Sequence, residues 1–125
     1  EAYCHKGDSE KALKWLNELR RNRIDGVSDL TVGTLPEVRK GDRIVVDCYG
    51  KPLTPLLQAI FDERRKEMYM EGDRWYELKR NGCPEWWVIS NGLKYTTKAY
   101  LYTSPISKSD VDLNPGLEQN PGYVY

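Results

Sequence analysis

Two segments of the chain repeat apolar residues at the spacing of an α-helix. The first begins near Asp8 or Ser9, and both residue types are favoured at the N-cap. Its apolar positions form one stripe of a helix: Ala12, Trp15, Leu16 and Leu19. Ala2 and Tyr3 fit the end of an earlier helix, which the Gly7-Asp8 turn joins to this one as an antiparallel pair. Such a pair is the unit of helical-repeat folds, although one pair does not establish a repeat.

The second periodic segment begins with Thr54 as N-cap and Pro55 at the first helical position, where the missing N–H costs nothing. Its apolar face continues far along the chain: Leu56, Leu57, Ile60, Phe61, Met68, Trp75 and Leu78. Gly72 falls inside this pattern and predicts an interruption. Asp73 then caps a second short helix, which ends at Asn81-Gly82.

The segment between these helices, residues 25–51, lacks helical periodicity. Glycine and proline punctuate it, so it predicts an ordered loop. Residues 43–49 are rich in β-branched side chains and predict one short strand.

The chain beyond the second helix is aromatic and irregular. Asn91-Gly92 lies between residues 86–89 and 93–97, and this dipeptide is typical of a β-hairpin turn. Pro105, Pro115 and Pro121 favour an irregular, extended tail. The sequence therefore predicts a mainly α fold: a helical pair with long loops, a small β-hairpin and an irregular C-terminal tail.

Length and charge narrow the class of protein. The 125 residues suffice for one core, so we expect residues 1–125 to form a single domain. Lysine plus arginine and aspartate plus glutamate each number 19. Nucleic-acid-binding proteins normally carry a basic surplus, so this balance argues against a nucleic-acid partner. The longest aliphatic or tryptophan run, residues 86–89, is too short to span a bilayer.

The three cysteines, Cys4, Cys48 and Cys83, form no disulfide framework, because their number is odd and their spacing wide. Cys4 adjoins His5, but two ligands do not close a metal site, so we expect no metal and no cofactor. Free thiols of this kind are most often buried and inert. The chain begins at Glu1 without a methionine or signal peptide, and we expect it to be a piece of a longer protein.

Charged residues of both signs crowd the second helical segment. Residues 62–80 contain six acids and six bases, a balance that favours pairing within the protein over a basic stripe for phosphate. Arg64 interrupts the apolar face, where an unpaired guanidinium is costly to bury. Glu67 and Glu71 lie within reach of it. We therefore predict a partly buried structural charge network of Arg64, Glu67, Glu71 and Arg74.

The same carboxylates admit a catalytic alternative. Glycoside hydrolysis needs two carboxyl groups about 5–10 Å apart across a cleft. Glu63, Glu67 and Glu71 share one helix with many cations, which lower carboxyl pKa values and spoil a general acid. The serines lack a neighbouring base motif, and we predict that the chain is not an enzyme. The basic cluster at residues 20–23 suits the C-terminal end of a helix better than RNA binding.

Trp86 and Trp87 are the candidate ligand-binding residues. Adjacent residues on a strand point to opposite faces, so one side chain can be core while the other is exposed. An exposed tryptophan ring suits stacking on a sugar, and its N–H suits a hydroxyl. The alternative is that both rings cover the helices. Exposure of the two tryptophans in a concave patch favours binding, and burial of both favours a scaffold.

Three segments, in order along the chain, resemble conserved motifs of the SusD/RagB family of nutrient-binding outer-membrane lipoproteins. Residues 60–82 read IFDERRKEMYMEGDRWYELKRNG and resemble the family pattern ERR-EL--EG-RW-DL-R-G. Residues 105–123 read PISKSDVDLNPGLEQNPGY and resemble the family's closing PIP…NP-L-QNPGY, with Ser107 in place of the second proline. Residues 12–23 read ALKWLNELRRNR and resemble A---LN-LR-RR.

The resemblance implies a fold with tetratricopeptide-like helix pairs, of which this chain is the C-terminal portion. It implies a non-catalytic, cell-surface lipoprotein of the outer membrane that captures an oligosaccharide or other nutrient. The partner is a TonB-dependent transporter of the SusC type, and a lipid-accepting cysteine is expected upstream of Glu1. Three hypotheses stay open: a glycan-binding component, a structural module that contacts the transporter without a ligand site, and a glycoside hydrolase.

Overall fold

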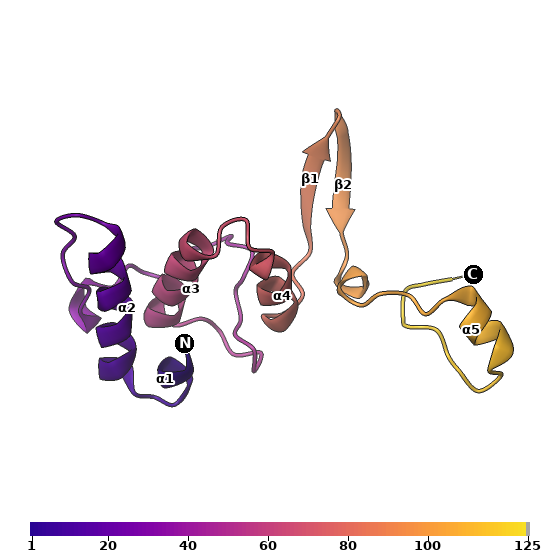
Figure 1. The fold of residues 1–125 in the computed structure, drawn as a ribbon, viewed down its shortest axis with the longest axis horizontal. Helices are drawn as coiled ribbons and strands as arrows, with labels where there is room; N and C mark the ends of the chain where they lie inside the picture. Colours follow the sequence, from indigo (N-terminus) through magenta and orange to yellow (C-terminus); the bar gives the residue numbers. More distant parts are fainter. Residues whose placement is uncertain (125) are drawn as a thin grey trace.

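The computed structural model describes residues 1–124 and has the predicted mainly α architecture. Its elements follow in this order: α1 (Ala2–His5), α2 (Ser9–Arg23), η1 (Val32–Thr34), α3 (Pro55–Glu67), α4 (Asp73–Arg80), β1 (Trp86–Ser90), β2 (Leu93–Thr97), η2 (Ala99–Tyr102) and α5 (Lys108–Leu113). Helices α1 to α4 gather at one end, the hairpin β1–β2 rises beyond them, and α5 lies at the opposite end (Figure 1). No helix in residues 1–124 combines the length and the apolarity needed to cross a membrane.

The predicted starts of α2 and α3 are confirmed by their caps. The Asp8 side chain accepts a hydrogen bond from the backbone N–H of Lys11 at 3.1 Å. Thr54 Oγ1 accepts one from Leu57 at 3.3 Å, directly before Pro55. Each bond satisfies an N–H that a helix otherwise leaves without a partner.

The interruption at Gly72 separates α3 from α4. Gly72 has a φ of +76°, and Met70 before it has a φ of +66°, so the backbone turns through two left-handed positions. The expectation that Asp73 caps α4 is wrong, because Gly72 occupies the N-cap and Asp73 is the first helical residue. Its carboxylate is thereby free to face α3.

The strand predicted at residues 43–49 does not form. Its single ladder contact is an isolated bridge between Val46 and Pro52. Ile44 is instead buried in the core, and Asp47 ends the segment in a turn with Gly50. Ile44 therefore serves packing, whereas Val45 is 55% exposed. Residues 51–53 run beside this segment and bond to it through Asp47 N–H to Lys51 O and Leu53 N–H to Val45 O, a contact too short to form a strand.

Helix α3 lies between two hydrophobic clusters. On one side it packs against α2, in a cluster of Ala12, Leu13, Leu16, Leu56, Ala59 and Ile60. On the other it joins α4 and the chain around η2, in a cluster of Ile44, Leu53, Leu57, Phe61, Leu78 and Tyr102. Helix α3 thus organises the core, as its long apolar face predicts.

The predicted β-hairpin is present. Asn91 and Gly92 have φ values of +50° and +75°, as a type I′ turn requires. Both strands stand clear of the helices, and most of their side chains are exposed on both faces (Figure 1).

The tail is more ordered than its sequence predicts. It contains η2 and α5, and the hydroxyl of Ser107 caps α5 by accepting from Asp110 N–H at 3.2 Å. Gln119 bonds both the N–H and the C=O of Ile106, at 2.8 and 2.9 Å. These side-chain hydrogen bonds join residues 13 positions apart and so hold two parts of the tail together. The composition of the tail does not predict them.

Candidate functional site

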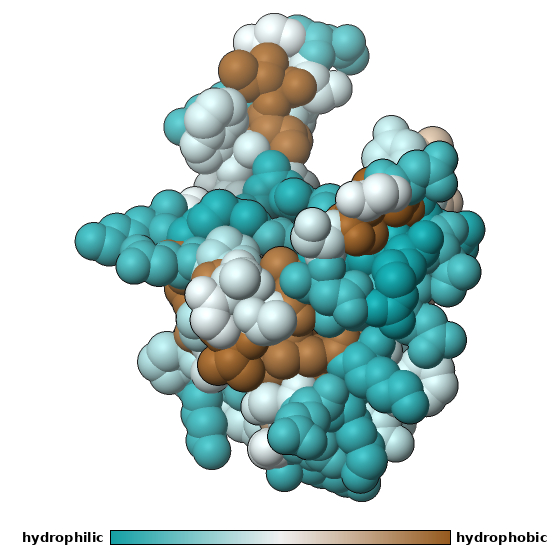
Figure 2. Space-filling model, turned by 90° about the vertical axis from the view of Figure 1, so that its left-hand side faces the viewer, coloured by the Kyte–Doolittle hydropathy of each residue, from teal (hydrophilic) through white to brown (hydrophobic). Residues whose placement is uncertain are grey.

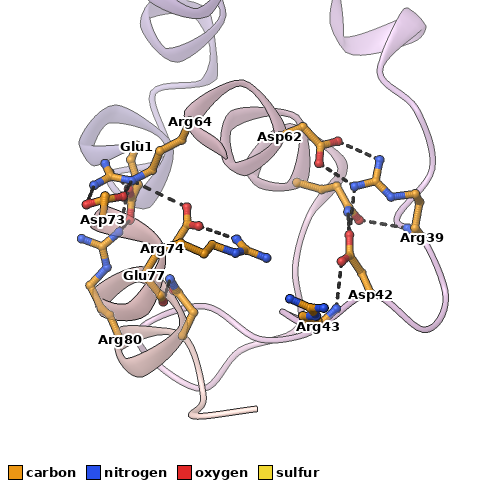
Figure 3. A network of polar contacts seen from close by, with 12 residues as sticks. Glu1, Arg39, Asp42, Arg43, Asp62, Arg64, Asp73, Arg74, Glu77 and Arg80 are labelled. Carbon is orange, nitrogen blue, oxygen red and sulfur yellow. Dashed lines mark hydrogen bonds and ion pairs between the residues drawn. The ribbon is translucent and has the colours of Figure 1, made fainter. Parts of the chain in front are cut away.

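The charge network lies where α3 and α4 meet (Figure 3). Arg64 of α3 donates two hydrogen bonds to Asp73 of α4, from Nε at 2.9 Å and from Nη2 at 2.7 Å. This hydrogen-bonded guanidinium lowers the pKa of Asp73, and the same pairing raises the pKa of Arg64. A two-point bond of this kind fixes both position and orientation, so it sets how α4 follows α3.

Glu77 lies at the centre of this network. Its side chain is 1% exposed, and it pairs with Arg74 one turn before it on α4. Arg64 Nε lies 3.6 Å from the same carboxylate, and Glu77 also accepts Asn81 Nδ2 at its backbone oxygen, at 2.8 Å. Two guanidinium groups thus compensate one buried carboxylate.

Only two of the four residues predicted to form the charge network contact the same partner. Arg64 and Arg74 meet through Glu77, whereas Glu67 pairs with Arg23 of α2. Glu71 has no ion pair among the described residues. The expected pairing of Arg64 with Glu67 and Glu71 is therefore wrong in its partners.

A second network, which the sequence pattern did not predict, ties the loop before α3 to that helix. Arg39 donates to Asp62 of α3 from Nη1 at 2.8 Å and to Asp42 from Nη2 at 2.9 Å. These carboxylates, Asp62 first, raise the pKa of Arg39. Buried Gln58 completes the network by donating to Asp42 at 2.9 Å and accepting from the N–H of Arg39 at 2.9 Å. Arg39 and Asp42 are three residues apart, but the bonds that reach α3 join residues 16 to 23 apart, beyond the reach of helical spacing rules.

Two of the three carboxylates considered for catalysis, Glu63 and Glu67, are engaged in ion pairs, and within the described part of the chain Glu71 is not. Glu63 faces Lys66 at 2.9 Å and Arg20 at 3.7 Å, and Glu67 faces Arg23. Within residues 1–124, no group of three histidine, cysteine, aspartate or glutamate side chains could hold a metal ion. The arrangement of these residues is that of fold-stabilising ion pairs.

The two adjacent tryptophans of β1 have different surroundings. The indole N–H of Trp86 donates to the hydroxyl of Tyr102 at 3.0 Å, and the guanidinium of Arg43 lies 4.4 Å from its ring centroid. Trp86 is thus half-buried at the root of the hairpin. Trp87 is 54% exposed, and the ammonium of Lys94 lies 4.9 Å from its ring centroid.

The hairpin also exposes aliphatic and aromatic side chains near Trp87: Val88, Ile89, Leu93 and Tyr95. Cross-strand pairs place Val88 opposite Tyr95 and Trp87 opposite Thr96. Figure 2 shows apolar side chains on the part of the molecule that rises above the body. An apolar, two-faced projection of this kind is a surface suited to contact with another molecule.

A second exposed tryptophan, Trp15 on α2, lies beside an apolar groove between α2 and α3. The groove is lined by Tyr3, Ala12, Trp15, Leu16, Leu19, Ile60 and Met68, among others. Viewed from the α2 end, the body shows an apolar patch bordered by hydrophilic residues (Figure 2). Trp15 is 55% exposed, so it matches Trp87 in accessibility but lies outside the hairpin.

The exposed apolar side chains of the hairpin mark a candidate interaction surface on a helical body held together by arginine–carboxylate pairs. The chain belongs to the SusD family, whose pattern it matches over residues 1–123. This match confirms the family that the three sequence motifs resemble. Proteins of this family are nutrient-binding proteins generally associated with the outer membrane. Searches of curated proteins and of solved structures found no match.

Proposed function

We propose that this chain is the C-terminal portion of a cell-surface lipoprotein that binds an oligosaccharide and delivers it to a SusC-type TonB-dependent transporter. The family match over residues 1–123 carries this proposal. The protein acts without catalysis, and its ion-paired helices serve as scaffold. Neither a cofactor nor a nucleic acid is part of the proposal.

The proposed contact for the sugar is the ring of Trp87. An exposed indole face stacks on the apolar face of a pyranose, and the neighbouring Lys94 ammonium adds a donor for hydroxyl groups. Trp86 serves a different purpose, because its N–H is already bonded to Tyr102. It anchors the strand from which Trp87 projects.

The test is oligosaccharide binding measured by isothermal titration calorimetry over a panel of soluble glycans. Trp87→Ala should weaken binding about fivefold to tenfold, the equivalent of about 1 kcal/mol for one stacking contact. Trp15→Ala is the matched control, because Trp15 is equally exposed but lies on α2, and it should leave the affinity unchanged. Equal affinities for wild type and Trp87→Ala contradict the assignment of the sugar to this ring, while no binding by any glycan contradicts the function itself.

A second function is favoured by the aliphatic part of the hairpin. Ile89 and Leu93 are 66% and 61% exposed, and such side chains suit a protein partner better than a sugar. On this alternative the hairpin contacts the transporter and this chain has no ligand site of its own. Ile89→Ser combined with Leu93→Ser should then abolish co-purification of the transporter, while Trp15→Ser leaves it intact.

A further inference from the structure

The turn that follows Val46 brings a cysteine and a histidine together from distant parts of the chain. Cys48 Sγ lies 3.8 Å from His5 Nε2, although 43 residues separate them. His5 ends α1, and Cys48 lies in the turn that Asp47 and Gly50 close with a 3.0 Å backbone hydrogen bond. A thiol within hydrogen-bond reach of an imidazole is the arrangement in which cysteine becomes a nucleophile.

A third group faces the other nitrogen of the imidazole. Asp47 Oδ2 lies 3.7 Å from His5 Nδ1. The second oxygen of this carboxylate, Oδ1, accepts the N–H groups of Tyr49 and Lys51, each at 2.9 Å. Asp47 is buried, and the backbone of its own turn fixes its position. The thiol of Cys48 therefore faces one nitrogen of the imidazole and the carboxylate of Asp47 faces the other. The backbone of the turn, and not His5 or Cys48, holds Asp47 in place.

Two further groups face His5. Glu1 Oε1 lies 3.7 Å from His5 Nε2, and the Tyr49 ring meets the imidazole edge-on, with 5.3 Å between centroids. Glu1 and Asp47 thus place one carboxylate near each nitrogen of the imidazole.

The other two cysteines lack this environment. Burial raises the pKa of the Cys4 thiol. Cys83 donates its S–H to the backbone oxygen of Lys79 at 3.2 Å, so its hydrogen-bond partner is a carbonyl and not an imidazole. All three cysteines are free and half-buried, so they differ in chemistry more than in exposure.

Space for a small reagent lies beside His5 and the turn that carries Cys48. A cavity of about 670 Å³ is lined by His5 and by Asp47 and Tyr49, the residues on either side of Cys48, and also by Cys4, whereas Cys48 is not one of its lining residues. This volume is in the range of small-molecule sites.

We propose that Cys48 is a thiol that exchanges with small-molecule disulfides, with His5 as its proton acceptor and Asp47 as the residue that positions the imidazole. The S–H proton passes to His5 Nε2, and the thiolate attacks one sulfur of the disulfide. A new S–S bond forms to Cys48, and the original S–S bond breaks. The departing thiolate takes the proton from His5, so Cys48 is oxidised and the small disulfide is reduced to one thiol and one mixed disulfide.

The experiment compares the three cysteines in the folded chain. Serine substitution at two positions leaves one thiol at a time, for example Cys4→Ser with Cys83→Ser, which leaves Cys48. Each variant reacts with glutathione disulfide, and peptide mass spectrometry measures the rate of mixed-disulfide formation. The same rates in concentrated urea give the unfolded reference, in which the three thiols should react alike.

The proposal expects Cys48 to react about tenfold faster folded than unfolded near pH 6.5, and Cys4 and Cys83 to react more slowly folded than unfolded. A folded rate for Cys48 at or below its unfolded rate overturns the proposal. This comparison needs no change at His5, so it decides the matter even if variants at that position fold poorly.

The pH dependence of the Cys48 rate separates proton transfer from structural support. His5→Gln removes the proton acceptor, so the pH profile of the folded rate should become that of the unfolded chain, and Asp47→Asn should move it part of the way. A wild-type profile identical to that of His5→Gln contradicts the role of His5.

Discussion

Replacing Glu77 with glutamine tests whether the network between α3 and α4 holds the fold. The substitution keeps the size of the side chain but removes the charge that Arg64 and Arg74 share. Removing one partner of a fully buried ion pair costs about 3–5 kcal/mol. Glu77 is 1% exposed, but the two arginine side chains are 30% and 32% exposed and regain water in part. We therefore expect a lower loss, about 2–3 kcal/mol in the free energy of unfolding.

The assay is urea unfolding followed by tryptophan fluorescence. With a denaturant slope of about 1–3 kcal/mol/M, the midpoint should fall by about 0.7–3 M while the slope stays constant. Glu85→Gln makes the same chemical change at a carboxylate that is 49% exposed and paired with Lys98, and its midpoint should match the wild type. If Glu77→Gln and Glu85→Gln have the same midpoint, the buried network contributes nothing to stability and the reasoning is refuted.

Two further predictions concern the tail and the acid stability of the fold. Gly122 has a φ of +90°, and a Cβ there falls 2.4 Å from Tyr100 Cγ, so Gly122→Ala should lower the melting temperature in calorimetry. Gly116→Ala, at an open position, is its control, and equal melting temperatures contradict the packing of Gly122 on Tyr100. The Arg64 pairing lowers the pKa of folded Asp73 below its unfolded value of about 3.9, so its stabilisation is present above that pH and is lost as the pH falls through the folded pKa. Asp73→Asn should therefore flatten the loss of stability below about pH 4 in acid titrations monitored by circular dichroism, and an unchanged slope contradicts the pairing.

The helices and the hairpin were predictable because their signals are local. Asp8 and Thr54 cap helices within three residues, and Asn91-Gly92 needs only its own backbone to turn the chain. The predicted strand at 43–49 failed because pairing depends on a partner, and the chain near Val46 has only the bridge to Pro52. β-branched residues are found at buried positions as well as in strands, so their presence alone does not predict a sheet.

The sequence predicted that Arg64 and Arg74 belong to a charge network, but it did not predict which carboxylates they pair with. Helical spacing ranks Glu67 as the nearest carboxylate to Arg64, yet the left-handed turn at Gly72 brings Asp73 and Glu77 to it from the next helix. The contact between His5 and Cys48 spans 43 residues and has no local signature. Trp86 and Trp87 were predictable as opposite faces, whereas the choice of which ring is half-buried depends on Tyr102 and Arg43.

The rooted hairpin has a mechanical consequence. Trp86 is held at the base of the hairpin by Tyr102 and Arg43, while the turn at Asn91 lies at the far end of the two paired strands. Two strands alone are marginally stable in water. The hairpin is therefore fixed at its base and mobile at its turn. Binding of a partner at the turn should first be detected as a loss of motion there, before any change in conformation.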